Sequence, residues 1–140
     1  MSQTKRPCIV FDTNALVSAA ILPASPCRRA LLLATGNFCI VHSSATWLEL
    51  DEVIARKKFD RYFPDESRSE FLLTLARASQ FIESSASVTD CTDPADYRFL
   101  ELALDAKAET IVSGDEHLRS MHPWRGIAIL SPGEFLQGHA

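Results

Sequence analysis

CIVFDTN at residues 8–14 is the stretch that decides the fold, because an apolar run there ends on Asp12 just before a helix is expected to begin. The stretch TIVSGD at residues 110–115 repeats the pattern and ends on Asp115. In an open parallel sheet, ligands bind at the carboxyl ends of the strands. Both aspartates are therefore predicted to lie on the same rim of one sheet.

The composition is that of one ordinary folded domain, expected to span residues 1–140. A chain of 140 residues with 46% hydrophobic residues can bury a sufficient core without disulfides or structural metal. The charged fraction of 23%, without a long charge run, argues against disorder. The net charge of -4 is not typical of a protein that coats nucleic acid, but a nuclease stays open, since an acidic metal pocket lowers the formal charge.

The start of the chain does not resemble a targeting or membrane segment. MSQTKRPCIVFD contains only a short apolar run, which leads straight into an aspartate and lacks the length of a signal peptide or a membrane span. A cytoplasmic protein without membrane association is expected.

The cysteines and histidines do not indicate a zinc or redox site. The four cysteines are far apart and form no CxxC pair, so zinc-ribbon and thioredoxin chemistry both lack their spacing. Cys8 and Cys39 lie inside expected strands and are interpreted as small buried hydrophobic residues. His117 and His122 are five apart, which is a poor spacing for zinc, and are interpreted as ordinary surface or core residues.

Apolar strand patterns alternate with amphipathic helix patterns along the chain. Strands are expected at residues 8–11, 38–41, 81–82, 110–112 and 127–130. Helices are expected at residues 14–22, 26–35, 43–57, from 65, from 93, near 117 and from 132, with N-caps at Ser25, Ser43 or Ser44, Asp65, Asp93 and Ser131, and with Gly36 as a left-handed C-cap. The alternation predicts an α/β fold in which helices cover both faces of a parallel sheet.

Each strand-end aspartate has a capping interpretation beside the ligand one. Asp12 could cap the following helix, but Thr13 or Asn14 could cap it as well, which favours a ligand role for the acid. Asp115 could be a turn or cap residue, since Gly-Asp is common turn chemistry. The hydroxyl of Ser113, two residues earlier, could instead orient a ligating Asp115 carboxylate by a hydrogen bond.

Two helical acids are weaker candidates for the same pocket. Glu49 and Glu52 are neighbours on one helix face, and a solvated face is the usual place for both. Glu52 can pair with Arg56 at the i,i+4 spacing, which leaves Glu49 freer for chemistry, although the pattern barely separates them. Asp96 falls in a first helical turn beside the apolar stripe, where it either complements the helix dipole or points into a shared pocket. Four carboxylates together suit a hard divalent cation and phosphodiester chemistry.

Several stretches, in this order along the chain, resemble the PIN-domain family, and more narrowly the VapC-like toxins of bacterial toxin–antitoxin pairs. They are IVFDTN at residues 9–14, WLELDEVIARKKF at 47–59, DPADYRFLELAL at 93–104, VSGDEHL at 112–118 and ILSPGEFL at 129–136. The resemblance implies a three-layer α/β/α sandwich with a central, mainly parallel sheet of about five strands. It also implies a metal-dependent ribonuclease site.

Transferred position by position, the resemblance implies a complete set of site residues. The four family acids fall on Asp12, Glu49, Asp96 and Asp115, and the polar supporting positions fall on Asn14 and Ser113, where the family often has threonine in place of Ser113. The implied chemistry is cleavage of RNA with one or two Mg²⁺ or Mn²⁺ ions, a cognate antitoxin as partner and a homodimer. Basic residues near the rim are candidate substrate contacts: Arg28, Arg29, Arg56, Lys57, Lys58, Arg61 and Arg119.

Two other functions compete with the nuclease. A phosphatase of the haloacid-dehalogenase kind would use a strand-end aspartate as its nucleophile, but its DxDxT signature needs a second acid where Asn14 stands. A partner-binding module with weak or no catalysis would use the same fold to engage an antitoxin. Cleavage of a mixed RNA pool stimulated by Mn²⁺ separates the nuclease from the binding module.

Overall fold

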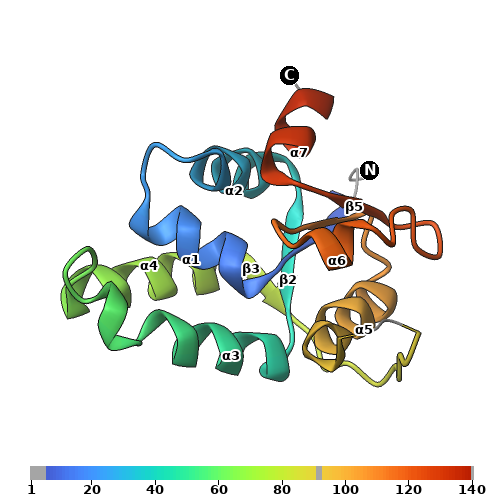
Figure 1. The fold of residues 1–140 in the computed structure, drawn as a ribbon, viewed down its shortest axis with the longest axis horizontal. Coiled ribbons are helices and arrows are strands. Elements are labelled where there is room, and N and C mark those ends of the chain that lie inside the picture. The colour runs from blue at the N-terminus through green and yellow to red at the C-terminus, as the bar shows by residue number, and fades with distance from the viewer. Residues whose placement is uncertain (1–5, 91–92, 140) are drawn as a thin grey trace, which may run out of the picture.

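A five-stranded, all-parallel sheet organises the parts of the chain that the computed structural model describes, residues 6–90 and 93–139 (Figure 1). The strand order is β3-β2-β1-β4-β5, so the first strand lies at the centre. The strands are β1 (Cys8–Phe11), β2 (Cys39–His42), β3 (Ser79–Phe81), β4 (Thr110–Val112) and β5 (Ala128–Leu130). The predicted α/β fold with a parallel sheet is confirmed.

Helices cover both faces of this sheet, which confirms the predicted three layers (Figure 1). Helices α1 to α4 and α7 share one apolar core with the strands, and α5 and α6 share the core on the opposite face. The helices are α1 (Thr13–Ile21), α2 (Pro26–Asn37), α3 (Ser44–Ile54), α4 (Asp65–Arg77), α5 (Tyr97–Ala106), α6 (Glu116–Arg119) and α7 (Pro132–Gly138), with 3₁₀ turns η1 (Lys57–Phe59) and η2 (Pro94–Asp96).

Alternate side chains along β1 are buried in the two cores on opposite faces of the sheet. Ile9 and Phe11 are buried in the core under α1 and α2, whereas Val10 is buried in the core under α5. This is the period-2 pattern of a strand covered on both faces. Phe11 pairs with Val112 in the register of β1 and β4, so these two central strands end side by side.

Serine caps set the start of three helices as predicted. Ser25 accepts a hydrogen bond from the backbone N–H of Arg28 at 3.2 Å, and Ser43 and Ser131 each form a capping box at the start of α3 and α7. The expected cap at Asp65 is wrong, since Pro64 precedes α4 there and makes no side-chain cap.

The ends of several elements differ from the prediction. Helix α2 continues through Gly36 to Asn37, because Phe38 is the extended residue that closes the helix, donating to the carbonyl of Ala34 at 2.8 Å. Gly36 is therefore not a left-handed cap; among the described residues, positive φ occurs at Lys107, Arg125 and Gly126.

Strand β2 consequently begins at Cys39 and extends to His42, one residue beyond the predicted end. Helix α3 ends at Ile54, earlier than predicted, because Arg56 is extended and Lys57 starts a separate 3₁₀ turn. Strand β3 begins at Ser79, two residues earlier than predicted.

Three smaller features complete the fold. Strand β5 begins at Ala128, one residue later than predicted. Cys8 and Cys39 are only partly buried, because both lie at the amino end of the sheet, where the cores thin out. None of the described helices is by itself long and apolar enough to cross a membrane, and α1 and α2 pass that test only as a pair bent by 104°.

Candidate active site

Asp12 leaves the carboxyl end of β1 and is almost fully buried, with 6% of its surface exposed. Its Oδ1 accepts the backbone N–H of Ala15 at 2.9 Å, so the capping interpretation of Asp12 is confirmed, and Thr13 and Asn14, which could have capped α1 instead, lie inside the helix. Its Oδ2 accepts the hydroxyl of Ser113. Burial raises the pKa of Asp12 against the effect of these hydrogen bonds, and the charges of neighbouring acids raise it further.

Ser113 connects the ends of the two central strands. Its fully buried hydroxyl donates to Asp12, and the same oxygen accepts the backbone N–H of Asp115 at 3.0 Å. The prediction that this hydroxyl orients the carboxylate of Asp115 is wrong, because the hydroxyl bonds the carboxylate of Asp12 and only the backbone of Asp115. Asp115 is half-buried and caps α6 by accepting the N–H of His117 at 3.0 Å.

Glu49 projects from α3 toward the start of α1. Its Oε2 accepts the hydroxyl of buried Thr13, and its Oε1 lies 3.0 Å from Nη1 of Arg98. Glu52 is exposed, and no ion pair joins it to Arg56 in the described residues. The structure thus brings Glu49, and not Glu52, toward the aspartates.

Thr13 and Arg98 are the contacts that the sequence interpretation missed. The sequence analysis considered Thr13 only as a cap and did not consider Arg98. Arg98 follows Asp96 by two residues, and this closeness in sequence was the one available sign that its charge belongs near the acids. Its contact with Glu49 depends on α3 meeting α5 in space.

Asp96 ends η2 at the start of α5 and is half-buried. Its side chain forms no cap hydrogen bond to the helix. Burial raises its pKa to about 6, and the charges of Asp115, Asp93, Asp12 and Glu49 add to that effect. Asp96 therefore experiences the field of every other predicted acid, which places Asp12, Glu49, Asp96 and Asp115, the acid cluster, at one end of the sheet.

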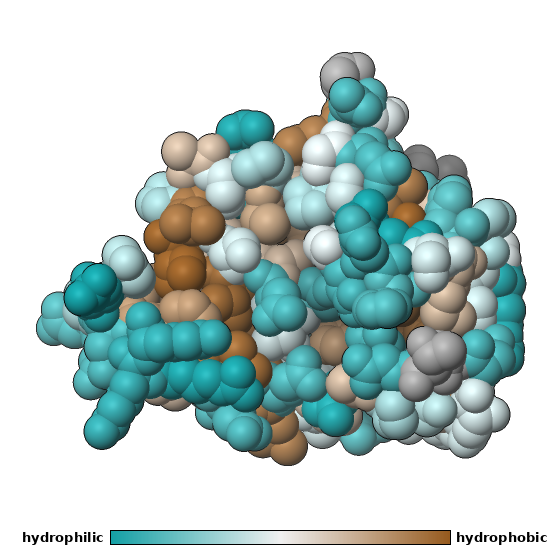
Figure 2. Space-filling view, in the orientation of Figure 1, coloured by the Kyte–Doolittle hydropathy of each residue, from teal (hydrophilic) through white to brown (hydrophobic). Residues whose placement is uncertain are grey.

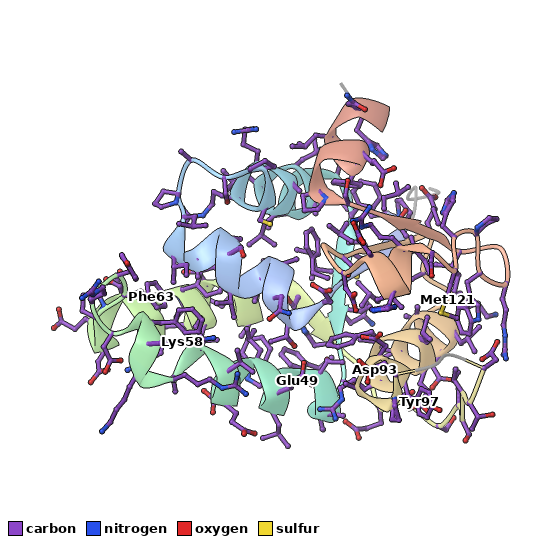
Figure 3. All side chains as sticks on the ribbon, in the orientation of Figure 1. Glu49, Lys58, Phe63, Asp93, Tyr97 and Met121 are labelled. Carbon is purple, nitrogen blue, oxygen red and sulfur yellow. The ribbon has the colours of Figure 1, made fainter. Side chains whose placement is uncertain are left out.

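Figure 3 shows the side of this region where Glu49 on α3 faces Asp93 and Tyr97 near the start of α5. Across the described residues, no three His, Cys, Asp or Glu side chains converge closely enough to hold one ion. Both oxygens of Asp12 and both oxygens of Glu49 have protein partners.

The donor set nevertheless fits a hard divalent cation. All four side chains offer carboxylate oxygens, which Mg²⁺ and Mn²⁺ prefer. Burial raises the pKa values of Asp12 and Asp96, and the charges of the neighbouring acids raise them further. A bound cation would offset both effects.

The predicted supporting and substrate-contacting residues have different surroundings. Asn14 is exposed on α1, outside the hydrogen bonds that connect the acids. Arg28 is bound to the carbonyls of Ala19 and Ala20 at 2.5 and 3.2 Å, which fixes the start of α2 against α1. Arg29 donates to the carbonyl of Ala24 at 2.9 Å. These two arginines thus have structural partners.

The other predicted basic residues fall into two groups. Arg56, Lys57, Lys58 and Arg61 lie around η1, and Figure 3 shows Lys58 at the opposite side of the view from Asp93. Lys58 and Arg61 stack over the neighbouring rings of Phe59 and Tyr62 at 5.1 and 5.7 Å. Arg119 is half-buried on α6, one helical turn after Asp115, and is the predicted contact nearest to the acids in sequence.

An aromatic cluster covers the carboxyl end of β2. The ring of His42 lies 5.0 Å from Trp47 and 5.6 Å from Phe81. His42 is 1% exposed, its Nε2 has no hydrogen-bond partner within the described chain, and burial lowers its pKa to about 4. Trp47 is half-buried in this packing and packs against the apolar core.

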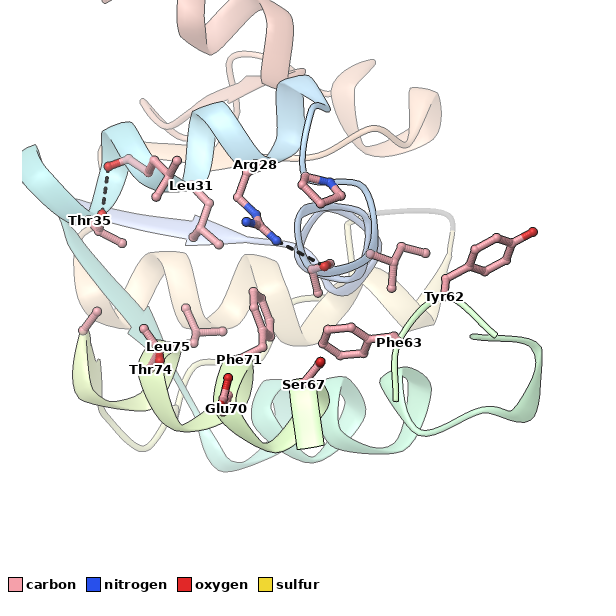
Figure 4. Close-up of a pocket in the computed structure, with 15 residues that line it drawn as sticks. Arg28, Leu31, Thr35, Tyr62, Phe63, Ser67, Glu70, Phe71, Thr74 and Leu75 are labelled. Atoms are coloured by element: carbon pink, nitrogen blue, oxygen red, sulfur yellow. Dashed lines mark hydrogen bonds between the residues drawn. The ribbon is translucent and has the colours of Figure 1, made fainter. Parts of the chain in front are cut away.

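An apolar groove of about 550 Å³, which the sequence analysis did not predict, lies between α1, α2 and α4 (Figure 4). Figure 2 shows hydrophobic surface over these helices. Leu32 of α2 and Tyr62 before α4 are both 61% exposed at its border. The apolar side chains that line the groove include Ile21, Leu31, Leu32, Tyr62, Phe63, Phe71 and Leu75.

Comparisons with known proteins agree with this architecture. The sequence pattern of the PIN domain matches residues 8–117. The uncharacterized protein MJ1680 of Methanocaldococcus jannaschii is 29% identical over 115 residues, which cover 81% of this chain and 74% of that protein.

Two crystal structures share the fold. One is VapBC2 from Rickettsia felis bound to a DNA fragment from their promoter, with a TM-score of 0.60 at 16% identity over 87% of this chain and 96% of that chain. The other is PAE2754 from Pyrobaculum aerophilum, with a TM-score of 0.59 at 14% identity over 92% of this chain and 87% of that chain. At these identities the likeness concerns the fold alone.

Proposed function

Because this chain belongs to the PIN-domain family, whose members are generally nucleases, we propose that it is a metal-dependent endoribonuclease and the toxin of a toxin–antitoxin pair. The observation that carries the proposal is the meeting of Asp12, Glu49, Asp96 and Asp115 at one end of the sheet. Burial and, after it, the charges of the neighbouring acids raise the pKa of Asp96, and a divalent cation bound there would offset both effects.

The acid cluster would hold Mg²⁺ or Mn²⁺, as one or two ions, through Asp12, Asp96 and Asp115, with Glu49 as a direct or water-mediated ligand. When bound, the ion would supply the Lewis acidity that hydrolysis of a phosphodiester by water requires. Ser113 and the α1 N-terminus orient the carboxylate of Asp12, and Thr13 orients that of Glu49.

RNA is the proposed substrate, on the strength of the family. The net charge of the chain is -4, so basic side chains near the acids must offset the repulsion of a polyanion locally. Arg98 and Arg119, on the helices that begin beside Asp96 and Asp115, have the most suitable positions. Lys57 and Lys58 at η1 would contact only a longer RNA.

A cognate antitoxin is the proposed partner, and the apolar groove supports this part of the proposal. Solvent-exposed apolar surface of this kind marks interaction sites, and an amphipathic helix is the element that fills such a groove. Helix α1 connects the two sites, since Thr13 at its start contacts Glu49 and Ile21 at its end lines the groove. An antitoxin helix bound there could extend to the acids.

The decisive experiment is cleavage of a mixed RNA pool with and without Mn²⁺. We expect Mn²⁺-dependent cleavage by the native chain and a loss of at least about a hundredfold in Asp12→Asn, which keeps an oxygen for the Ala15 N–H but removes the charge. Asp51→Asn, an exposed acid of α3, is the matched control and should cleave normally. Full activity of Asp12→Asn, or equal activity in EDTA, would contradict the proposal.

A partner-binding module without catalysis is the second candidate. One observation favours it, namely that protein donors occupy both oxygens of Asp12 and of Glu49. The same experiment separates the two candidates, because the binding module cleaves no RNA even at high Mn²⁺. A homodimer and a cytoplasmic location are further parts of the proposal, and light scattering coupled to size exclusion tests the first.

A further inference from the structure

Arg98 occupies an unusual position for a basic side chain in this protein. Among the ion pairs between described residues, its contact with Glu49 is the one that involves the acid cluster. The other paired arginines contact acids outside the cluster: Arg68 pairs with Asp65, and Arg125 pairs with Asp90. A positive charge beside a proposed cation site opposes the cation, so this pair needs an explanation beyond stability.

The geometry of the pair makes it easy to open. One nitrogen of Arg98 contacts one oxygen of Glu49 at 3.0 Å, so the two-pronged contact that strengthens arginine–carboxylate pairs is absent. The side chain of Arg98 is 38% exposed and that of Glu49 is 23% exposed. A pair as open to water as this one contributes little to stability.

Glu49 and Arg98 also differ in the further hydrogen bonds that hold their side chains. Glu49 keeps the hydroxyl of Thr13 on its other oxygen, so it stays in place when Arg98 leaves. No hydrogen bond to a further described residue holds the guanidinium of Arg98. Its attachment to α5, two residues after Asp96, keeps it near the acids after release.

We propose that Arg98 is an exchangeable counter-ion of the acid cluster. It pairs with Glu49 while no cation is bound, and it turns to a phosphate of the RNA when the cation takes its place at Glu49. The planar guanidinium suits phosphate oxygens, and the cation that displaces it compensates the charge that Glu49 loses. This inference rests on the proposed nuclease function and adds a substrate-binding residue and a control on cation binding.

The proposal predicts opposite effects of one substitution on two measurements. In Arg98→Gln, competition for Glu49 disappears, so Mn²⁺ affinity, measured by electron paramagnetic resonance of free Mn²⁺, should rise about two- to fivefold. At saturating Mn²⁺, single-turnover RNA cleavage should fall at least about tenfold, since a charged contact to phosphate is lost. A variant that is merely destabilised would weaken both.

Two further variants separate the exchange from a general charge effect. In a protein that already carries Glu49→Gln, adding Arg98→Gln should not change the Mn²⁺ affinity further, because the ion pair between Arg98 and Glu49 no longer exists. Arg98→Lys keeps the charge and the single contact and should keep the native Mn²⁺ affinity. Arg77→Gln removes an exposed arginine of α4 and should change neither measurement.

The outcomes distinguish this inference from the function on which it rests. If the native chain binds no Mn²⁺ and cleaves no RNA, the proposed nuclease fails, and the exchange fails with it. If the native chain does both, but Arg98→Gln leaves Mn²⁺ affinity or cleavage unchanged, the exchange alone is wrong. The exchange is also wrong if tighter Mn²⁺ binding persists in the Glu49→Gln background. Thermal unfolding of each variant confirms that it is folded.

Discussion

The acid cluster and the apolar groove lie at opposite ends of one helix, α1, and they are built in opposite ways. Thr13, the first residue of α1, donates to Glu49 in the cluster, and Ile21, the last, lines the groove. The eight helical steps from Thr13 to Ile21 span about 12 Å along the axis of α1. The cluster consists of carboxylates bound by hydrogen bonds, whereas apolar side chains of α2 and α4 line the groove.

Both regions are unfavourable in the isolated protein, for different physical reasons. The cluster concentrates like charges in a partly buried place, which raises the pKa of Asp96. The groove leaves large apolar side chains such as Leu32 in contact with water. Each region is improved by a ligand of its own kind, a cation for the first and an apolar helix for the second. The chemistry and the partner are therefore expected to be separable by mutation.

The largest effect is expected when one variant in each region is compared for RNA cleavage and for inhibition by the antitoxin. Asp96→Asn removes a charge from the cluster and should lower Mn²⁺-dependent RNA cleavage at least about a hundredfold. Leu32→Gln changes only the rim of the groove and should leave cleavage within about twofold of the native rate, while weakening inhibition by the cognate antitoxin about tenfold.

The prediction that the two regions are separable would be wrong if Leu32→Gln slowed cleavage as strongly as Asp96→Asn does. The two sites would then be coupled through α1. Circular dichroism of both variants distinguishes that coupling from a loss of fold.

Cation binding should stabilise the protein through the cluster alone. A ligand at a hundred times its dissociation constant adds about 2.7 kcal/mol to the free energy of unfolding. We expect Mn²⁺ to raise the unfolding temperature of the native chain and of Leu32→Gln by similar amounts. Asp115→Asn should lose most of that increase, and it should be somewhat more stable than the native chain in EDTA, since one like charge is gone. A Mn²⁺ effect that persists in Asp115→Asn would locate the ion elsewhere.

The sequence predicted the parts of the cluster that depend on local pattern. An apolar run that ends on an acid identifies a strand end, and strand ends of a parallel sheet share a rim, so Asp12 and Asp115 could be placed from their runs alone. The serine caps of α2, α3 and α7 could likewise be predicted from the sequence, because a cap bonds to a residue only three positions ahead.

The rest depended on distances that no pattern encodes. Arg98 meets Glu49 across 49 positions, and Ser113 gives its hydroxyl to Asp12 across 101 positions rather than to the Asp115 carboxylate two residues away. The groove was invisible because its walls come from separate helices, each with an ordinary amphipathic pattern. Asp12 also shows that a cap and a buried site residue can be the same side chain.

The smallest expected effect concerns the pH dependence of stability, to which the acid cluster and the aromatic cluster around His42 contribute with opposite signs. The pKa of Asp96 rises from an ordinary value of 3.8 to about 6, so the folded state binds more protons between these values and loses stability as the pH rises. The pKa of His42 falls from 6.5 to about 4, so the unfolded state binds more protons there and stability increases with pH.

These two groups oppose each other between about pH 4 and pH 6, and each contributes at most about 1.4 kcal/mol per pH unit. Urea unfolding of the native chain in EDTA should therefore give a shallow profile. Asp96→Asn removes the falling contribution, so its stability should increase more steeply with pH than that of the native chain. Leu32→Gln, in the groove, should keep the native profile. Parallel profiles for Asp96→Asn and the native chain would mean that neither burial nor the charges of the other acids raise the pKa of Asp96, and this support for cation binding at the cluster would be lost.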